Sequence, residues 1–74
     1  MGKLPRVTPR QVVAVLHRVG FIDDRQTGAH LILRHPITRR RAVVSIHRRD
    51  LKLKTLKSIL ADAGLTPEEF HELL

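Results

Sequence analysis

The sequence predicts an α+β fold in which a three-stranded antiparallel sheet carries its helices on one face. Three observations predict it: a helix-period apolar pattern near the N-terminus, short runs of β-branched and apolar residues in the middle, and two capped helical patterns toward the C-terminus. The chain has 74 residues, of which 42% are hydrophobic. That length and composition are typical of one small packed domain, which we expect to cover residues 1–74.

The N-terminal helix is predicted over residues 9–19. Thr8 is a favourable N-cap, Pro9 suits the first helical position, and Gly20 provides a C-terminal stop. Apolar residues recur at helical spacing inside these limits, at Val12, Val13, Leu16 and Val19.

Three strands are predicted next, over residues 21–26, 29–35 and 41–46. The first leads to Thr27-Gly28, the second ends at Pro36, and a basic turn over residues 36–40 joins the second to the third. Because side chains alternate between the two faces of a sheet, one apolar set is expected to face the helices. That set is Leu31, Leu33, Ala42, Val44 and Ile46.

Two helices are predicted after the sheet. Thr55 is expected to cap the first, which buries Leu56, Ile59, Leu60 and Ala63 and stops at Gly64. The segment Thr66-Pro67-Glu68-Glu69 forms a capping box with proline at the first position, which predicts a last short helix through Leu73.

The charge of the chain indicates a polyanionic partner. It carries 14 basic and 7 acidic residues, a net charge of +7, and all basic residues lie at or before Lys57. Ten of the 14 are arginine, whose guanidinium fork matches phosphate oxygens. A merely solvated basic surface is the alternative interpretation.

The composition also excludes several function classes. Cysteine is absent, which excludes disulfides, thiolate zinc sites and cysteine nucleophiles. Apolar runs fall far short of the roughly 20 residues that span a bilayer, and no signal-peptide pattern opens the chain. We therefore expect a cytoplasmic protein that makes no membrane contact.

Alternation predicts that the open face of the sheet carries polar and basic side chains: His30, Arg34, Arg41, Ser45 and His47. Two histidines beside two arginines are suited to handling a phosphodiester. The alternative is an ordinary solvated face, which is polar by default in antiparallel sheets.

Short motifs recur along the chain in a characteristic order. They are Gly20-Phe21, Arg25-Gln26-Thr27-Gly28-Ala29-His30, His35-Pro36, Lys54-Thr55-Leu56-Lys57-Ser58-Ile59-Leu60 and Ala63-Gly64-Leu65-Thr66-Pro67-Glu68-Glu69-Phe70. Together, from about Pro9 to Leu73, they resemble the HicA toxins of HicA–HicB toxin–antitoxin systems. The resemblance implies a double-stranded-RNA-binding-domain-like α-β-β-β-α fold, here with a short extra C-terminal helix.

The resemblance also implies an activity and a partner. It implies an endoribonuclease, an mRNA interferase, with His30 as its catalytic residue, and a HicB-like antitoxin that covers the active surface. The chain departs from the family pattern at Ala29, where serine is usual, and at Ser45, where proline is frequent.

The chemistry of RNA cleavage suggests roles for the residues of the open face. An imidazole titrates near neutrality, so His30 is expected to act as general base or acid, with His47 as a possible second proton carrier. Arg34 or Arg41 is the expected phosphate clamp, and Gly28 is expected to let the backbone turn into the strand.

No metal or other cofactor is expected. His30 and His35 are an odd number of residues apart on one strand, hence on opposite faces, and no carboxylate accompanies them. We therefore expect metal-independent chemistry. His17 and His71 are expected to be surface or helix-end residues, and His35 to cap the end of its strand.

Seven basic residues are the predicted RNA contacts: Arg25, Arg34, Arg39, Arg40, Arg41, Lys52 and Lys54. Arg48 and Arg49 belong to the same basic rim. The only aromatic residues are two phenylalanines, so recognition should rest on phosphates rather than on base stacking. A non-catalytic RNA-binding module is the alternative function. A helix-based DNA binder is weaker, because the first helix carries few basic residues on one face.

Overall fold

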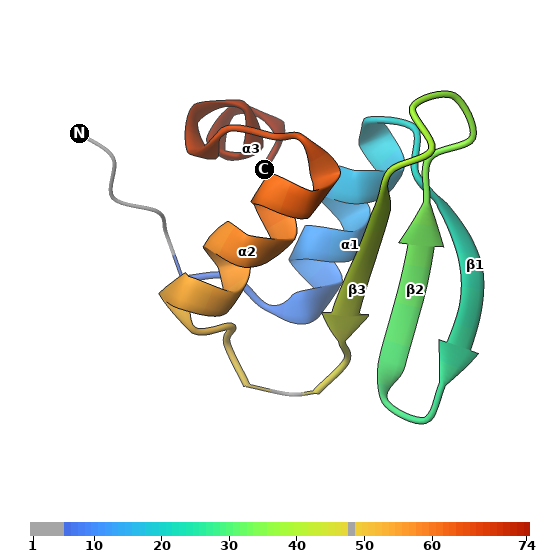
Figure 1. Cartoon of the computed structure of the whole chain (residues 1–74). Coiled ribbons are helices and arrows are strands. Elements are labelled where there is room, and N and C mark those ends of the chain that lie inside the picture. The colour runs from blue at the N-terminus through green and yellow to red at the C-terminus, as the bar shows by residue number, and fades with distance from the viewer. Residues whose placement is uncertain (1–5, 48) are drawn as a thin grey trace.

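The computed structural model describes residues 6–47 and 49–74 (Figure 1), and its element order is the predicted one. The elements are α1 (Pro9–Arg18), β1 (Ile22–Thr27), β2 (His30–Arg34), β3 (Arg41–Ser45), α2 (Leu53–Ala63) and α3 (Pro67–Leu73). Arg48, one of the predicted basic-rim residues, lies outside the described residues. Within the described part of the chain, no helix combines the length and apolar character that a membrane span requires.

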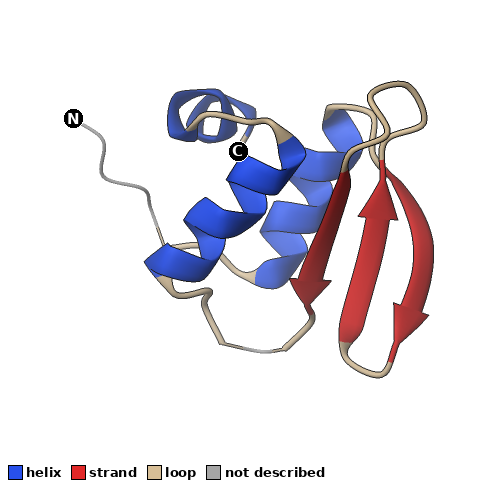
Figure 2. Cartoon of the chain, viewed as in Figure 1, coloured by secondary structure: helices blue, strands red, loops and turns tan. Residues whose placement is uncertain are grey.

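The three strands form an antiparallel sheet in the order β1-β2-β3. All helices lie on one side of it, so the sheet has one covered and one open face (Figure 2). The β2–β3 register is regular, pairing Leu31 with Val44 and Leu33 with Ala42. The β1–β2 register shifts between Asp23 and Arg25, which places a bulge in β1.

The core fills the space between the covered face and the helices. Leu33, Ala42 and Val44 from the sheet are at most 1% exposed, and Leu31 and Ile46 pack against the same core. The alternation prediction for the covered face is therefore confirmed. The helices contribute buried side chains that include Val12, Val15, Leu16, Leu56, Ile59, Leu60 and Phe70.

The ends of α1 and α3 follow the predicted capping chemistry. Thr8 forms a capping box with Gln11, and Thr66 forms one with Glu69. Gly64 ends α2 with a φ of 79°, in the left-handed region that favours glycine. Each box gives two otherwise unsatisfied groups of the helix start a partner, which holds both helices at fixed start points.

Helix α2 starts earlier than predicted. It begins at Leu53 with Lys52 as N-cap, and no side chain caps it, whereas Thr55 was the expected cap. The cause is Leu51, which is 8% exposed and whose backbone N–H donates to the Val7 carbonyl at 2.9 Å. This anchor fixes the chain directly before the helix, and lysine and leucine, both good helix formers, continue it from there.

His35 joins three parts of the fold. Its Nε2 lies 3.1 Å from the Val19 carbonyl at the end of α1, and its Nδ1 lies 3.1 Å from the backbone N–H groups of both Ile37 and Thr38. The ring also meets Phe21 edge-on, with 5.2 Å between centroids. His35 thus acts structurally at the end of β2, as predicted. These contacts require a neutral ring that donates through Nε2 and accepts at Nδ1.

We predict that His35→Ala lowers the free energy of unfolding by about 2–3 kcal/mol, because two turn N–H groups and one carbonyl lose their partner at a half-buried site. Urea unfolding followed by circular dichroism measures this loss. His71→Ala on exposed α3 is the control and should cost less than about 0.5 kcal/mol. Equal losses in the two variants would contradict the role of His35.

Candidate active site

The open face of the sheet is organised in three cross-strand rows, because paired residues in an antiparallel sheet point to the same side. We call the nine side chains of these rows, three in each row, the outer face. The rows are Thr27–His30–Ser45, Arg25–Ile32–Val43 and Ile22–Arg34–Arg41. The predicted grouping of His30, Arg34, Arg41 and Ser45 on one face is therefore confirmed, whereas His47, predicted with them, lies beyond the end of β3. The rows show in addition that apolar side chains separate these polar ones.

His30 opens β2, directly after the two-residue turn Gly28-Ala29. Gly28 has a φ of 57°, as the first loop position of a type II′ hairpin turn requires. The Ile46 N–H donates to the Ala29 carbonyl at 2.6 Å, which ties the turn to the end of β3. The position of His30 is thus fixed from both neighbouring strands.

The imidazole of His30 is available to a ligand. Its side chain is exposed, and no group of residues 6–47 and 49–74 hydrogen-bonds to it. His17 differs, because its Nε2 lies 2.7 Å from an Asp23 carboxylate oxygen. His35 differs too, because its ring nitrogens contact backbone groups. Of these three histidines, His30 is therefore the one whose ring nitrogens make no contact with another group of the described residues.

The predicted phosphate clamp lies far from His30. Arg34 and Arg41 face each other across β2 and β3 at the opposite end of the sheet. Four residues of strand separate His30 from Arg34, about 13 Å at the usual rise per residue. Arg25 is nearer, since its row adjoins the His30 row, two residues or about 7 Å away. An anion held between Arg34 and Arg41 is therefore a strand length from the imidazole.

Arg39 and Arg40 lie beyond the same distant end, in the turn between β2 and β3. Arg39 has a φ of 67°, an uncommon conformation for a residue with a Cβ. Arg40 donates from Nη1 to the Asp62 carbonyl at 3.4 Å, and its guanidinium packs on Gly64 at the end of α2. The structure thus separates these two arginines from the His30 end of the sheet.

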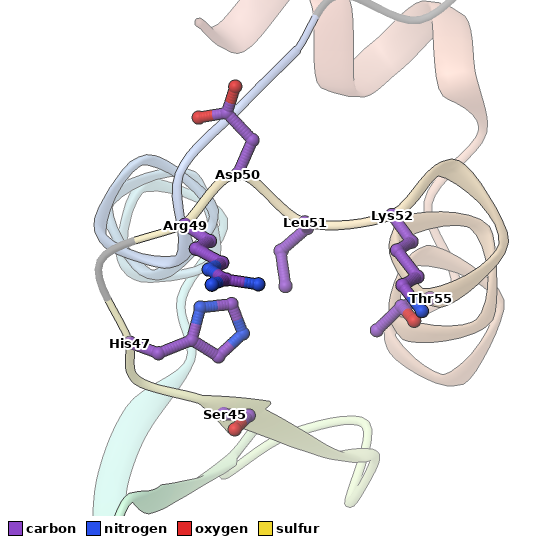
Figure 3. A pocket seen from close by; sticks show the side chains of 7 residues that line it. All are labelled: Ser45, His47, Arg49, Asp50, Leu51, Lys52 and Thr55. Carbon is purple, nitrogen blue, oxygen red and sulfur yellow. The ribbon is translucent and has the colours of Figure 1, made fainter.

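A pocket of about 530 Å³ opens beside His30, between the end of β3 and the start of α2. We call it the β3–α2 pocket (Figure 3); its lining residues are Ser45, His47, Arg49, Asp50, Leu51, Lys52 and Thr55. Ser45 is the direct cross-strand partner of His30, so the pocket reaches the row that carries His30, although His30 itself does not line it. Of the predicted site residues, His47 and Lys52 line it. Lys54 does not.

The structure therefore connects the face of His30 and Ser45 with a pocket that the sequence analysis did not predict. Arg49 was predicted only as part of the basic rim, and Thr55 only as a helix cap. The one signal for the pocket in the sequence is the density of basic residues on both sides of Leu51. Within the described residues, no group of three or more His, Asp or Glu side chains is placed to hold a metal ion.

Comparison with known families identifies the chain. The family model described as the HicA toxin of bacterial toxin–antitoxin matches residues 9–65, most of the sequence. The chain belongs to the HicA toxin family. It is thus a toxin of a toxin–antitoxin system, whose partner is an antitoxin. A search of curated proteins gave no significant match.

The match covers the elements that build the candidate site in this HicA chain. Residues 9–65 include the whole sheet, the turn before His30 and all residues that line the β3–α2 pocket. Helix α3 lies beyond the match, and its contribution is Phe70, which is fully buried in the core. The family relation therefore applies to the surface that carries His30.

The outer face of this HicA chain carries an electrostatic strain that can be measured. Arg34 and Arg41 are exposed cross-strand partners, and among the described residues neither forms a salt bridge. Like charges directly opposite each other destabilise a sheet. We predict that Arg41→Gln raises the free energy of unfolding by about 0.2–1 kcal/mol at low salt, and that 1 M salt removes most of the gain.

A double-mutant cycle isolates this repulsion from other effects of the substitution. In an Arg34→Gln background, Arg41→Gln should give no gain, because the repulsion is already absent. Urea unfolding at low and high salt measures all four variants. A gain of the same size in both backgrounds would show that the two guanidinium groups do not interact.

Proposed function

We propose that this HicA toxin is a cytoplasmic endoribonuclease that cleaves mRNA, with His30 as its catalytic proton carrier. The observation that carries the proposal is the exposed imidazole of His30, free of protein partners in the described part of the chain, on a face whose charged residues are all cationic. A ring held at a strand start by a tight turn and a cross-strand hydrogen bond is positioned for reaction.

The reaction that fits these groups uses the RNA's own 2′-hydroxyl. His30 accepts the proton of that hydroxyl, the 2′-oxygen attacks the adjacent phosphorus, and the bond to the 5′-oxygen breaks. The leaving oxygen takes up one proton, so the products are a 2′,3′-cyclic phosphate and a 5′-hydroxyl. His30 returns the proton that it accepted, or a protonated His47 supplies one while His30 keeps the proton of the 2′-hydroxyl. These steps require proton carriers and cations but no metal ion.

We propose that RNA is held by its phosphates. Arg25, Arg34 and Arg41 extend along the outer face, and Lys52 lines the adjacent pocket. Arg39 and Arg40 in the β2–β3 turn, and Lys54 on α2, are the remaining proposed contacts. No tryptophan or tyrosine offers a stacking platform. Binding is therefore weakly selective for sequence and falls steeply with added salt.

The proposed protein partner is a HicB-like antitoxin that covers the outer face. The apolar side chains of Ile22 and Val43 are 55% and 44% exposed on it, between the arginines. Apolar area bordered by cations suits an acidic protein surface with its own apolar centre. Such a partner would hide His30 from RNA and so explain inhibition.

We predict that His30→Ala reduces the rate of RNA cleavage by about 10²–10⁴-fold, the usual contribution of general acid–base catalysis. The assay is gel analysis of a labelled RNA in the presence of EDTA, with the products tested for cyclic phosphate ends. His71→Ala is the matched control, since it removes an exposed histidine on α3, far from the outer face. An RNA blocked by 2′-O-methyl groups should remain intact with every variant.

Two results would overturn the proposal. Undiminished cleavage by His30→Ala would remove His30 from the mechanism. RNA binding by the wild-type chain without any cleavage would instead assign the alternative function, a non-catalytic RNA-binding module. Folding of each variant is checked by circular dichroism, so that loss of structure is not mistaken for loss of chemistry.

A further inference from the structure

The β3–α2 pocket is a second source of positive charge on the His30 side of the sheet, besides Arg25 on the outer face. Ser45 lines that pocket and is the direct cross-strand partner of His30, so the two Cα atoms are about 4.5–5.5 Å apart. Arg34 and Arg41, by contrast, lie about 13 Å along the strands. A phosphate close to the imidazole can therefore be bound by cations of the pocket as well as by Arg25.

The lining of the pocket combines cations with polar and apolar side chains. Arg49 and Lys52 contribute two permanent cations, and His47 adds an imidazole (Figure 3). Arg49 and His47 extend side by side into the pocket, whereas the carboxylate of Asp50 is turned away from it. Among the described residues, none of these charged groups forms a salt bridge within the protein. Because Asp50 is also a lining residue, the pocket carries two permanent cations and one carboxylate, which leaves a net positive charge.

The size and the remaining lining of the pocket suit a nucleotide better than a bare phosphate ion. Its volume of about 530 Å³ lies within the range of small-molecule sites. Buried Leu51 gives an apolar surface for a sugar or base, and Thr55, exposed on the first turn of α2, offers a hydroxyl. Ser45, half-buried, stands at the edge that adjoins His30.

We propose that the β3–α2 pocket binds the RNA backbone phosphate adjacent to the bond that His30 cleaves, with Arg49 and Lys52 as its charged ligands and Thr55 as a hydroxyl donor. This inference rests on the proposed ribonuclease function and deepens it. It assigns the phosphate subsite of the reaction to the β3–α2 connection, while Arg34 and Arg41 hold a phosphate farther along the strand.

The test separates binding from catalysis by using the His30→Ala chain throughout. Its affinity for a short single-stranded RNA is measured by fluorescence anisotropy over a range of salt concentrations. Arg49→Gln and Lys52→Gln are each expected to weaken binding by about ten- to a hundredfold, since each removes a charge-assisted hydrogen bond. The slope of log affinity against log salt should fall by about 0.7 if one phosphate contact is lost.

Lys57→Gln is the matched control. Lys57 is an exposed cation of the same helix, two positions after Thr55, so it points to the opposite side of α2 from the pocket. It should change RNA affinity by less than twofold. Circular dichroism confirms that all three variants keep the fold.

A neutral methylphosphonate, placed at one linkage of the RNA at a time, locates the contact. At one linkage, the methylphosphonate should weaken RNA binding to the His30→Ala chain as much as Arg49→Gln does. At that linkage, the methylphosphonate RNA and the Arg49→Gln protein together should bind no more weakly than either change alone. Losses that add at every linkage would overturn the subsite, as would equal affinities for Arg49→Gln and Lys57→Gln.

The outcomes also distinguish this inference from the proposed function. Weakened RNA binding by Arg49→Gln and Lys52→Gln supports the pocket even if the wild-type chain proves unable to cleave. Variants that keep RNA affinity but lose affinity for the antitoxin would show that the pocket receives an acidic protein side chain. That result would overturn the RNA subsite. It would not affect the proposal that His30 cleaves RNA, which the His30→Ala cleavage assay tests separately.

Discussion

The register between β2 and β3 determines which side chains this protein buries and which it presents. With Leu33 paired to Ala42, the apolar residues of both strands face the helices, and His30 and Ser45 become neighbours on the outer face. A shift of one residue would reverse both faces and bury arginines in the core, at a cost of several kcal/mol for each unpaired charge. The same pairing that builds the core therefore assembles the candidate site.

The second determinant is the path of the chain from β3 to α2. Leu51 is buried and its backbone is bonded to Val7, so the connection is drawn inward at one point while its charged residues remain at the surface. This arrangement opens the pocket beside His30 and starts α2 before Thr55, whose side chain then lines the pocket. The hydrophobic anchor thus sets the position of the cations around it.

Local sequence signals predicted most of the fold and the exposed position of His30. The capping boxes at Thr8 and Thr66 depend only on neighbouring residues, and strand alternation depends on a period that the sequence displays directly. The start of α2 and the β3–α2 pocket depend on the contact between Leu51 and Val7, which are far apart in sequence. The distance of about 13 Å between His30 and Arg34 arises because the two residues lie at opposite ends of β2. Alternation of side chains predicts only that they share a face.

The unpaired cations connect stability with binding. In the free chain Arg34 opposes Arg41, and this repulsion is one that the small core must offset, while Arg49 and Lys52 both line the pocket. Any anionic partner that binds the folded chain relieves this repulsion and stabilises the fold by mass action. On the proposed function, RNA and antitoxin cover the same face and exclude each other. The cations proposed to bind RNA phosphates are also cations without a salt-bridge partner among the described residues. An antitoxin that contacts both ends of the sheet would therefore inhibit the toxin and stabilise its fold through the same charges.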